Sequence, residues 1–176
     1  MKKLNLENIN KKAPYVVYER ENKLNEFYFW SDFGIVYDIY FSPNYSVVPS
    51  GTCEIGINNR GHQNSPRDPN FLLTLIAIIE EFFNSNDDVM LYMAETGDKK
   101  ESFRNRLFVM WFNNYENRKD YFLKTAEGKM EGQDNFMAII ARVDNPRLPQ
   151  VIEEFDETIS ILFDPPKKAH TETGAL

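Results

Sequence analysis

The sequence predicts an α+β fold, with an antiparallel or mixed sheet of about six to seven strands and three helices in the order β-β-β-β-α-β-α-β-β-α. Strand-like segments occur in hairpin-like pairs toward both ends of the chain, which favours antiparallel pairing with the helices gathered on one face. Three longer segments have the apolar content and the start signals of helices. Hydrophobic residues make up 42% of the 176 residues and aromatic residues 14%, enough for a folded core.

The first half of the chain is rich in β-forming residues after a polar start. Residues 1–14 are lysine-rich, and we expect a flexible basic arm there. Within 35–41 the odd-numbered residues are all apolar or aromatic, while Asp38 lies among the even-numbered ones, which predicts a strand with one buried face. Residues 58–66 are polar with glycine and proline breaks, so we expect a loop. The predicted strands of this half are 15–18, 27–30, 35–41 and 53–57.

A buried helix is predicted to follow Asp68-Pro69. Aspartate accepts hydrogen bonds from free backbone N–H groups at a helix start, and proline is well tolerated in the first helical position. From there to about Asn84 the residues are apolar almost all round, with Thr74, Glu80 and Glu81 as exceptions. Such a helix is covered on most sides and is expected to be the central element of the fold.

The second half alternates between strands and helices. Asp164-Pro165-Pro166 is expected to end the last helix, because proline cannot continue one. We therefore predict a single α+β domain over 15–163 and a disordered tail over 164–176. The elements expected in this half are strands at 89–94, 119–124 and 136–143, a polar connection over 125–135, and helices from about Lys99 to Tyr115 and from Leu148 onward.

An arginine on an aromatic helix face is the main candidate for a binding residue. At about 100° per residue, Arg104 falls between Trp111 and Tyr115 within a broad aromatic arc. A guanidinium there must reach past the rings or meet a carboxylate. It is either part of an anion site at the helix start or a structural ion pair, and the ion pair is favoured because acids already compensate this helix end. The candidate binding residues are Asp98, Lys100, Arg104, Arg106, Trp111 and His62.

The other polar residues form no catalytic motif. His62 lies in the loop at 58–68 without a motif that would supply a nucleophile or an orienting partner. Gly97 stands alone, without the spacing of a phosphate- or dinucleotide-binding loop. Cys53 is expected to be a small core residue, and Glu80 with Glu81 a solvated helix face. We therefore predict no catalytic residues, no cofactor and no metal site, which disfavours an enzyme.

Charge and cysteine content restrict the partners and the compartment. The net charge is −7, and residues 1–14 carry four lysines against one glutamate, so the remainder is more acidic still. An acidic chain repels phosphate backbones, which disfavours nucleic acid as a partner. The single cysteine excludes an internal disulfide. No secretory signal follows Met1-Lys2-Lys3 and no apolar run is long enough for a bilayer, so we expect a cytoplasmic protein without membrane association.

Several segments together resemble a known family. They are residues 29–34, 37–41, 91–98 and 104–112, the last with the pattern Arg-x-Arg-Leu-Phe-x-x-Trp-Phe. They resemble a bacterial family found mainly in Bacteroidetes, domain of unknown function 6169, over most of residues 15–163. Where that family tends to have a Cys-Asp-like pair before an Asp-Gly turn, this chain has Ala94-Glu95 and then Gly97-Asp98. The family has no assigned activity, so the resemblance implies a stand-alone bacterial domain and no particular chemistry.

Two functions remain open from the sequence. The first is a small accessory or regulatory protein that binds another protein, because the chain is acidic, lacks a catalytic motif and is rich in the aromatic residues that anchor interfaces. The second is a small-molecule or anion-binding domain, or an enzyme, with its site around Arg104 and residues 58–68. A nucleic-acid-associated protein ranks third, and the oligomeric state is not indicated.

Overall fold

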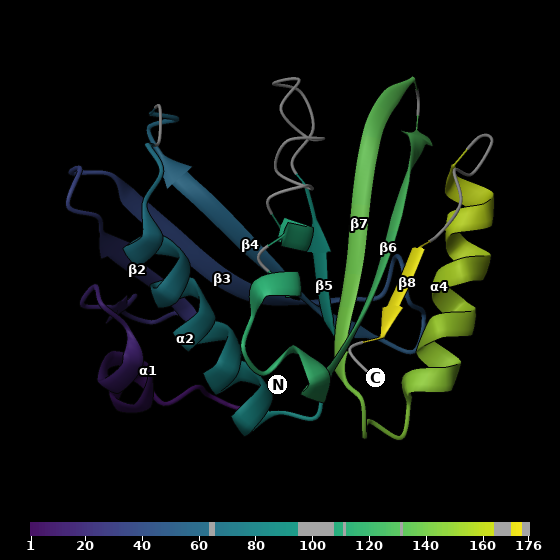
Figure 1. Ribbon diagram of the computed structural model, residues 1–176, viewed down its shortest axis with the longest axis horizontal. Coiled ribbons are helices and arrows are strands. Elements are labelled where there is room, and N and C mark those ends of the chain that lie inside the picture. Colours follow the sequence, from purple (N-terminus) through teal and green to yellow (C-terminus); the bar gives the residue numbers. More distant parts are fainter. Residues whose placement is uncertain (64–65, 95–107, 111, 131, 164–169, 174–176) are drawn as a thin grey trace. The chain divides into compact units, whose positions relative to one another are not determined.

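The computed structural model describes the chain except residues 64–65, 95–107, 111, 131, 164–169 and 174–176 (Figure 1). The chain divides into two compact units. The first unit is Met1–Ser42 with Ile55–Asp88, and the second is Pro43–Glu54 with Val89–Leu176. The α+β class with mostly antiparallel pairing is confirmed. The single domain over 15–163 stays a prediction.

In the first unit, a helix covers one face of antiparallel strands. Hydrogen-bonded neighbours follow the order β1-β2-β3-β4, and α2 crosses one face of β2, β3 and β4 (Figure 1). As predicted, α2 begins after Asp68, whose side chain accepts from the backbone N–H groups of Asn70 and Phe71. The elements are α1 (Leu6–Lys12), β1 (Tyr18–Glu19), β2 (Glu26–Trp30), β3 (Val36–Asn44), β4 (Thr52–Arg60) and α2 (Pro69–Ser85). The last two residues of β3 and the first three of β4 belong to the second unit.

The predicted alternation in β3 is confirmed. Tyr37 and Phe41 point toward α2, where their rings lie 4.4 Å from the ring of Phe71 and 4.9 Å from that of Phe82, respectively. Asp38, between them, points to the opposite side of the strands. We call these sides the inner face, whose residues are Phe27, Phe29, Tyr37, Ile39 and Phe41, and the outer face, whose residues are Tyr18, Arg20, Tyr28, Trp30, Asp38, Tyr40 and Arg60.

Where a flexible arm was expected over 1–14, the structure has helix α1. Asn5 begins it by accepting from two backbone N–H groups of the first turn. Leu4 and Ile9 are fully buried, so the segment is anchored despite its lysines. Glu81, expected to be solvated, is instead buried, and its carboxylate accepts from the Asn5 backbone N–H at 3.1 Å and from the Asn8 side chain at 3.3 Å. Two apolar anchors and one buried acid therefore fix a segment whose composition suggested mobility.

The same helix also contacts the chain just before β1. The Asn10 side-chain amide donates to the Val17 carbonyl oxygen at 2.9 Å, and its oxygen accepts from the Val17 N–H at 2.7 Å. A single side chain thus satisfies both backbone groups of one residue at the edge of the strand order.

In the second unit, β5, β7 and β6 pack against α4 on one face. The hydrogen-bonded order is β5-β7-β6-β8. Leu91 of β5 lies opposite Ile139 of β7, and both belong to a buried cluster with Val151 and Phe155 of α4. The elements are β5 (Met90–Met93), a 3-10 turn (Arg118–Asp120), β6 (Tyr121–Met130), β7 (Gln133–Arg142), α4 (Leu148–Leu162) and β8 (His170–Thr173), with helical residues at 108–110 and 112–114.

Two predictions in the second unit are wrong. Residues 125–135, expected to be a polar connection, belong largely to a long hairpin that continues to the pair Met130↔Gln133. The misleading signal was Gly128, which is needed because the ring of buried Phe163 occupies the space of a side chain there. In the predicted tail, β8 pairs with β6 from Phe122↔Thr173 to Thr125↔His170, which brings the described strands to eight.

Candidate functional site

Most of the site residues expected from sequence cannot be placed. Asp98, Lys100, Arg104, Arg106 and Trp111 lie outside the described residues. His62 is described: it is exposed, has a positive φ of 49°, and its backbone N–H donates to the Asn59 carbonyl oxygen at 3.0 Å. This is the geometry of a turn residue.

The described part of the chain shows neither a membrane-crossing helix nor a metal-binding cluster. None of its helices has the length and hydropathy that crossing a bilayer requires. No group of three His, Cys, Asp or Glu side chains within it is arranged to hold a metal ion. Cys53, expected to be a core residue, is buried as predicted. The most concentrated chemistry in the described residues lies elsewhere, on the outer face of the first unit.

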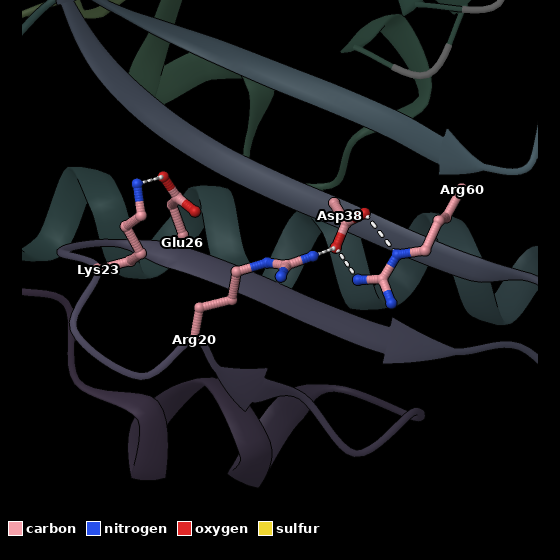
Figure 2. A network of polar contacts seen from close by, with 5 residues as sticks. All are labelled: Arg20, Lys23, Glu26, Asp38 and Arg60. Atoms are coloured by element: carbon pink, nitrogen blue, oxygen red, sulfur yellow. Dashed lines mark hydrogen bonds and ion pairs between the residues drawn. The ribbon is translucent and has the colours of Figure 1, made fainter.

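Two arginines converge on one aspartate at the centre of the outer face (Figure 2). Arg20 follows β1, Asp38 is in the middle of β3, and Arg60 ends β4. An Arg20 Nη donates to Asp38 Oδ1 at 2.7 Å. Arg60 donates from Nε to Oδ2 at 3.0 Å and from an Nη to Oδ1, which is the two-pronged geometry of a strong arginine–carboxylate pair.

Aromatic rings lie beside this ion-pair cluster. The ring centroid of Tyr28 lies 5.8 Å from the Arg20 guanidinium carbon and 5.9 Å from that of Arg60, within the range of cation–π attraction. Tyr18 stacks on Tyr28 at 5.4 Å, and Trp30 meets both rings edge-on at 5.5 and 5.2 Å. Three rings from two neighbouring strands thus form one contiguous platform.

The platform and the arginines reach solvent. The side chains of Arg20 and Arg60 are 41% and 46% exposed, while that of Asp38 is 14% exposed. Trp30 is 49% exposed and Tyr18 42%, values that are high for large aromatic residues of a strand. The cluster is therefore a surface feature in which a partly covered acid lies between two accessible cations.

The ion pairs set the protonation of the cluster. Burial raises the pKa of Asp38, but hydrogen bonds and charge from Arg60 and Arg20 outweigh that effect and hold it below the usual value of 3.8. The hydrogen bond to Asp38 raises the pKa of Arg60. At neutral pH the three groups therefore carry two positive charges and one negative charge. The nearby Lys23 and Glu26 form their own pair at 3.8 Å (Figure 2).

This arrangement suits recognition. Arginine and aromatic side chains combine charge, hydrogen-bond donors and flat apolar surface, which are the properties of interface anchors. Catalysis would call for a nucleophile or a general base close to the cluster. The one acid of the cluster is already occupied by two arginines, and its lowered pKa makes it a poor proton acceptor near neutral pH.

Sequence analysis did not find this cluster. The alternation in 35–41 placed Asp38 and Tyr40 on one face, but it gave no partner for the acid. Arg60 was assigned to a loop, although β4 continues to it. The sequence did contain a signal: if the strand that begins near Cys53 is continued, Gly56, Asn58 and Arg60 are alternate residues and lie on one face.

Comparison with known proteins identifies the family. The model of a family of unknown function, DUF6169, matches residues 67–157, more than half of the chain, and the chain belongs to that family. The match is narrower than the span of 15–163 expected from the resemblance, and it does not include β1, β2, β3 or β4. Neither the curated proteins nor the solved structures contain a match to the chain.

Proposed function

We propose that this member of the DUF6169 family is a protein-interaction domain with an accessory or regulatory role, and that its partner docks on the outer face of the first unit. The observation that carries this proposal is the three-ring platform of Tyr18, Tyr28 and Trp30 beside the arginine pair. Tyrosine, tryptophan and arginine are the residue types that most often dominate binding energy at protein interfaces.

The exposure of the platform supports the same proposal. Burying the exposed part of a tryptophan and a tyrosine against a partner removes apolar area from water, and each Å² contributes about 25 cal/mol. The rings also start from fixed positions, since each of the three touches the other two. Less conformational freedom is therefore lost on binding.

We further propose a bacterial source, in Bacteroidetes, and a cytoplasmic location. The source rests on the sequence resemblance, and the location rests on the single cysteine, which fits a reducing compartment. The alternative function, a small-molecule or anion site around Arg104 and residues 58–68, stays a prediction because Arg104 lies outside the described residues.

Affinity capture from a lysate of the source organism tests the proposal. The bait is the full chain as wild type, as a Tyr18→Ser/Trp30→Ser double variant, and as Ile161→Ser. Ile161 is the matched control, because it is an exposed apolar residue on α4 of the second unit. Circular dichroism of all three baits checks that they are folded.

We expect a stoichiometric protein on the wild-type and Ile161→Ser baits that is lost from the double variant. A partner that binds all three baits equally would place the interface elsewhere and overturn the assignment of the outer face. The absence of any stoichiometric partner on the wild-type bait would contradict the proposed function itself.

A further inference from the structure

We propose that the partner contributes an acidic segment, and that Arg20 and Arg60 bind one of its carboxylates while the rings beside them hold its apolar or aromatic neighbours. This inference rests on the proposed function and names the chemistry of the partner. It follows from the charge, the unused donors and the fixed orientation of the cluster.

The first step is charge. Arg20 and Arg60 share a single carboxylate, so the centre of the outer face carries one uncompensated positive charge. Among the nearby acids, Glu26 pairs with Lys23 at 3.8 Å and Glu19 with Lys3 at 3.0 Å. Glu54 of β4 lies six residues from Arg60, roughly 20 Å away along an extended strand, so it does not cancel the charge either. In a chain of net charge −7, this is a local cationic spot.

The second step is the supply of donors. Each guanidinium has five N–H groups. Arg20 uses one of them on Asp38, and Arg60 uses two. The remaining donors lie on side chains that are 41% and 46% exposed, so they are accessible from solvent. A carboxylate is the planar acceptor that matches two neighbouring N–H groups of a guanidinium.

The third step is preorganisation. Asp38 accepts hydrogen bonds from both arginines, and the Tyr28 ring lies within 6 Å of both guanidinium carbons. An unrestrained arginine loses much side-chain entropy when it binds an anion. Here Asp38 and Tyr28 have already restricted both side chains, so less is lost on binding. Asp38 therefore has two effects: it orients the arginines, and it competes with an incoming carboxylate for them.

The fourth step excludes a long polyanion as the preferred occupant. Rings with arginines also occur where proteins bind single-stranded nucleic acid. Such a strand extends its charges over many ångströms, however, and the net charge of −7 opposes this. A short peptide with one or two acidic residues senses mainly the local positive charge, since the Debye length is about 8 Å at physiological salt. The observations therefore favour an acidic peptide segment.

Fluorescence anisotropy with labelled peptides tests this inference on the full chain. The probe is a peptide of about ten residues with two glutamates beside tyrosines and uncharged residues elsewhere, and its matched control replaces both glutamates with glutamine. A third probe is single-stranded oligothymidine of similar length. We expect the glutamate peptide to bind at least about tenfold more tightly than the glutamine peptide at low salt, and this preference to shrink as salt rises.

Variants of the cluster separate recognition from structure. Arg20→Met and Arg60→Met should each weaken binding of the glutamate peptide by about five- to tenfold. Arg142→Met is the matched control: Arg142 forms a two-pronged pair with Asp144 at 3.0 and 3.1 Å in the second unit, and its loss should leave binding unchanged. Asp38→Asn should tighten binding severalfold, because it removes the competing charge while the amide oxygen can still accept from the arginines and orient them. A purely structural cluster predicts no such gain.

The outcomes decide between the alternatives. Equal binding of the glutamate and glutamine peptides, or binding that neither arginine variant weakens, overturns the inference. Tighter binding of oligothymidine than of the glutamate peptide also overturns it, in favour of nucleic acid. If the captured partner needs Tyr18 and Trp30 but tolerates both arginine variants, the inference fails while the proposed function stands. If no partner needs Tyr18 and Trp30, both fail.

Discussion

Strands β3 and β7 differ in how many of their faces are buried. In β7 every residue from Phe136 to Ala141 is buried. In β3 buried residues alternate with accessible ones: Tyr37, Ile39 and Phe41 are buried, whereas Asp38 and Tyr40 are not. A strand that is buried residue after residue is covered on both faces, whereas an alternating strand has one face against the core and one in solvent.

The cover on β7 comes from two sources. Ile139 belongs to the cluster against α4. On the opposite face, Phe136 contacts the ring of Tyr92, which in turn stacks on Phe108 at 4.4 Å. The first unit has α2 on one face only, so aromatic residues of the other face remain in solvent. The two sequences reflect this difference, because β7 has a continuous apolar run from Phe136 to Ala141 whereas β3 alternates and carries Asp38.

The largest expected effects come from adjacent residues on each strand. Ile139→Ala and Ile140→Ala should each lower the free energy of unfolding by about 2–5 kcal/mol, because both leave a cavity although they lie on opposite faces. In β3, Ile39→Ala should cost a similar amount, whereas Asp38→Ala should cost less than about 1 kcal/mol. Urea denaturation measures all four. An Ile140→Ala variant no less stable than Asp38→Ala would contradict the double cover of β7.

Two glycines sharpen the comparison at an intermediate size of effect. A methyl group at Gly128 would meet the ring of buried Phe163, and one at Gly56 would meet the ring of Tyr40. Phe163 cannot move aside within its core, so Gly128→Ala should cost about 1–3 kcal/mol. Tyr40 lies on the outer face and can swing into solvent, so Gly56→Ala should cost less than about 1 kcal/mol. Thermal unfolding measures both variants. Equal losses of stability would contradict the different surroundings assigned to the two glycines.

The ion pairs of the two units should also differ. In the second unit the Lys124 side chain is only 7% exposed, and its ammonium pairs with Asp156 at 2.9 Å. Asp156→Ala leaves that charge without its carboxylate and should cost about 1–2 kcal/mol. Lys124→Met should be close to neutral, because a similar apolar shape replaces the charge. Asp38→Asn on the outer face should cost less than Asp156→Ala, since water reaches both arginines. The reverse order in urea denaturation would argue against an open outer face.

The smallest expected effect is the pH dependence of the Asp38 pairs. Because Arg60 and Arg20 hold the pKa of Asp38 below 3.8 despite its burial, the pairs stabilise the protein at neutral pH. That stabilisation is lost as the pH falls through the lowered pKa of the folded state. The difference in unfolding free energy between wild type and Asp38→Asn should therefore be below about 1 kcal/mol at pH 7, shrink once the pH falls below 3.8, and vanish below the lowered pKa of the folded state. A difference that grows in acid would contradict the lowered pKa.

Features with a local chemical cause were predictable from the sequence. The start of α2 was predictable because capping by Asp68 and the tolerance of proline involve only neighbouring residues. The two faces of β3 were predictable because alternation is a property of a single strand. The start of α4 at Leu148 was predicted from Leu148-Pro149. In each case the deciding interactions span only a few residues.

Features that depend on distant partners were missed. Arg20 and Arg60 lie 18 and 22 residues from Asp38, and only the register of β1 to β4 brings them together. The burial of Glu81 depends on Asn5, which is 76 residues away. The hairpin at 125–135 was obscured by Gly128. A glycine is needed there because the ring of Phe163, at the end of α4, occupies the space of a side chain. Composition cannot show such pairings, because each partner alone has an ordinary surface sequence.

The contact between Asn10 and Val17 has a consequence for how a partner can approach. The amide of Asn10 donates to one backbone group of Val17 and accepts from the other, as a neighbouring strand would. An extended peptide that tried to add itself to the sheet there would first have to displace helix α1 with its buried Ile9. At this position α1 therefore opposes strand addition and β-aggregation.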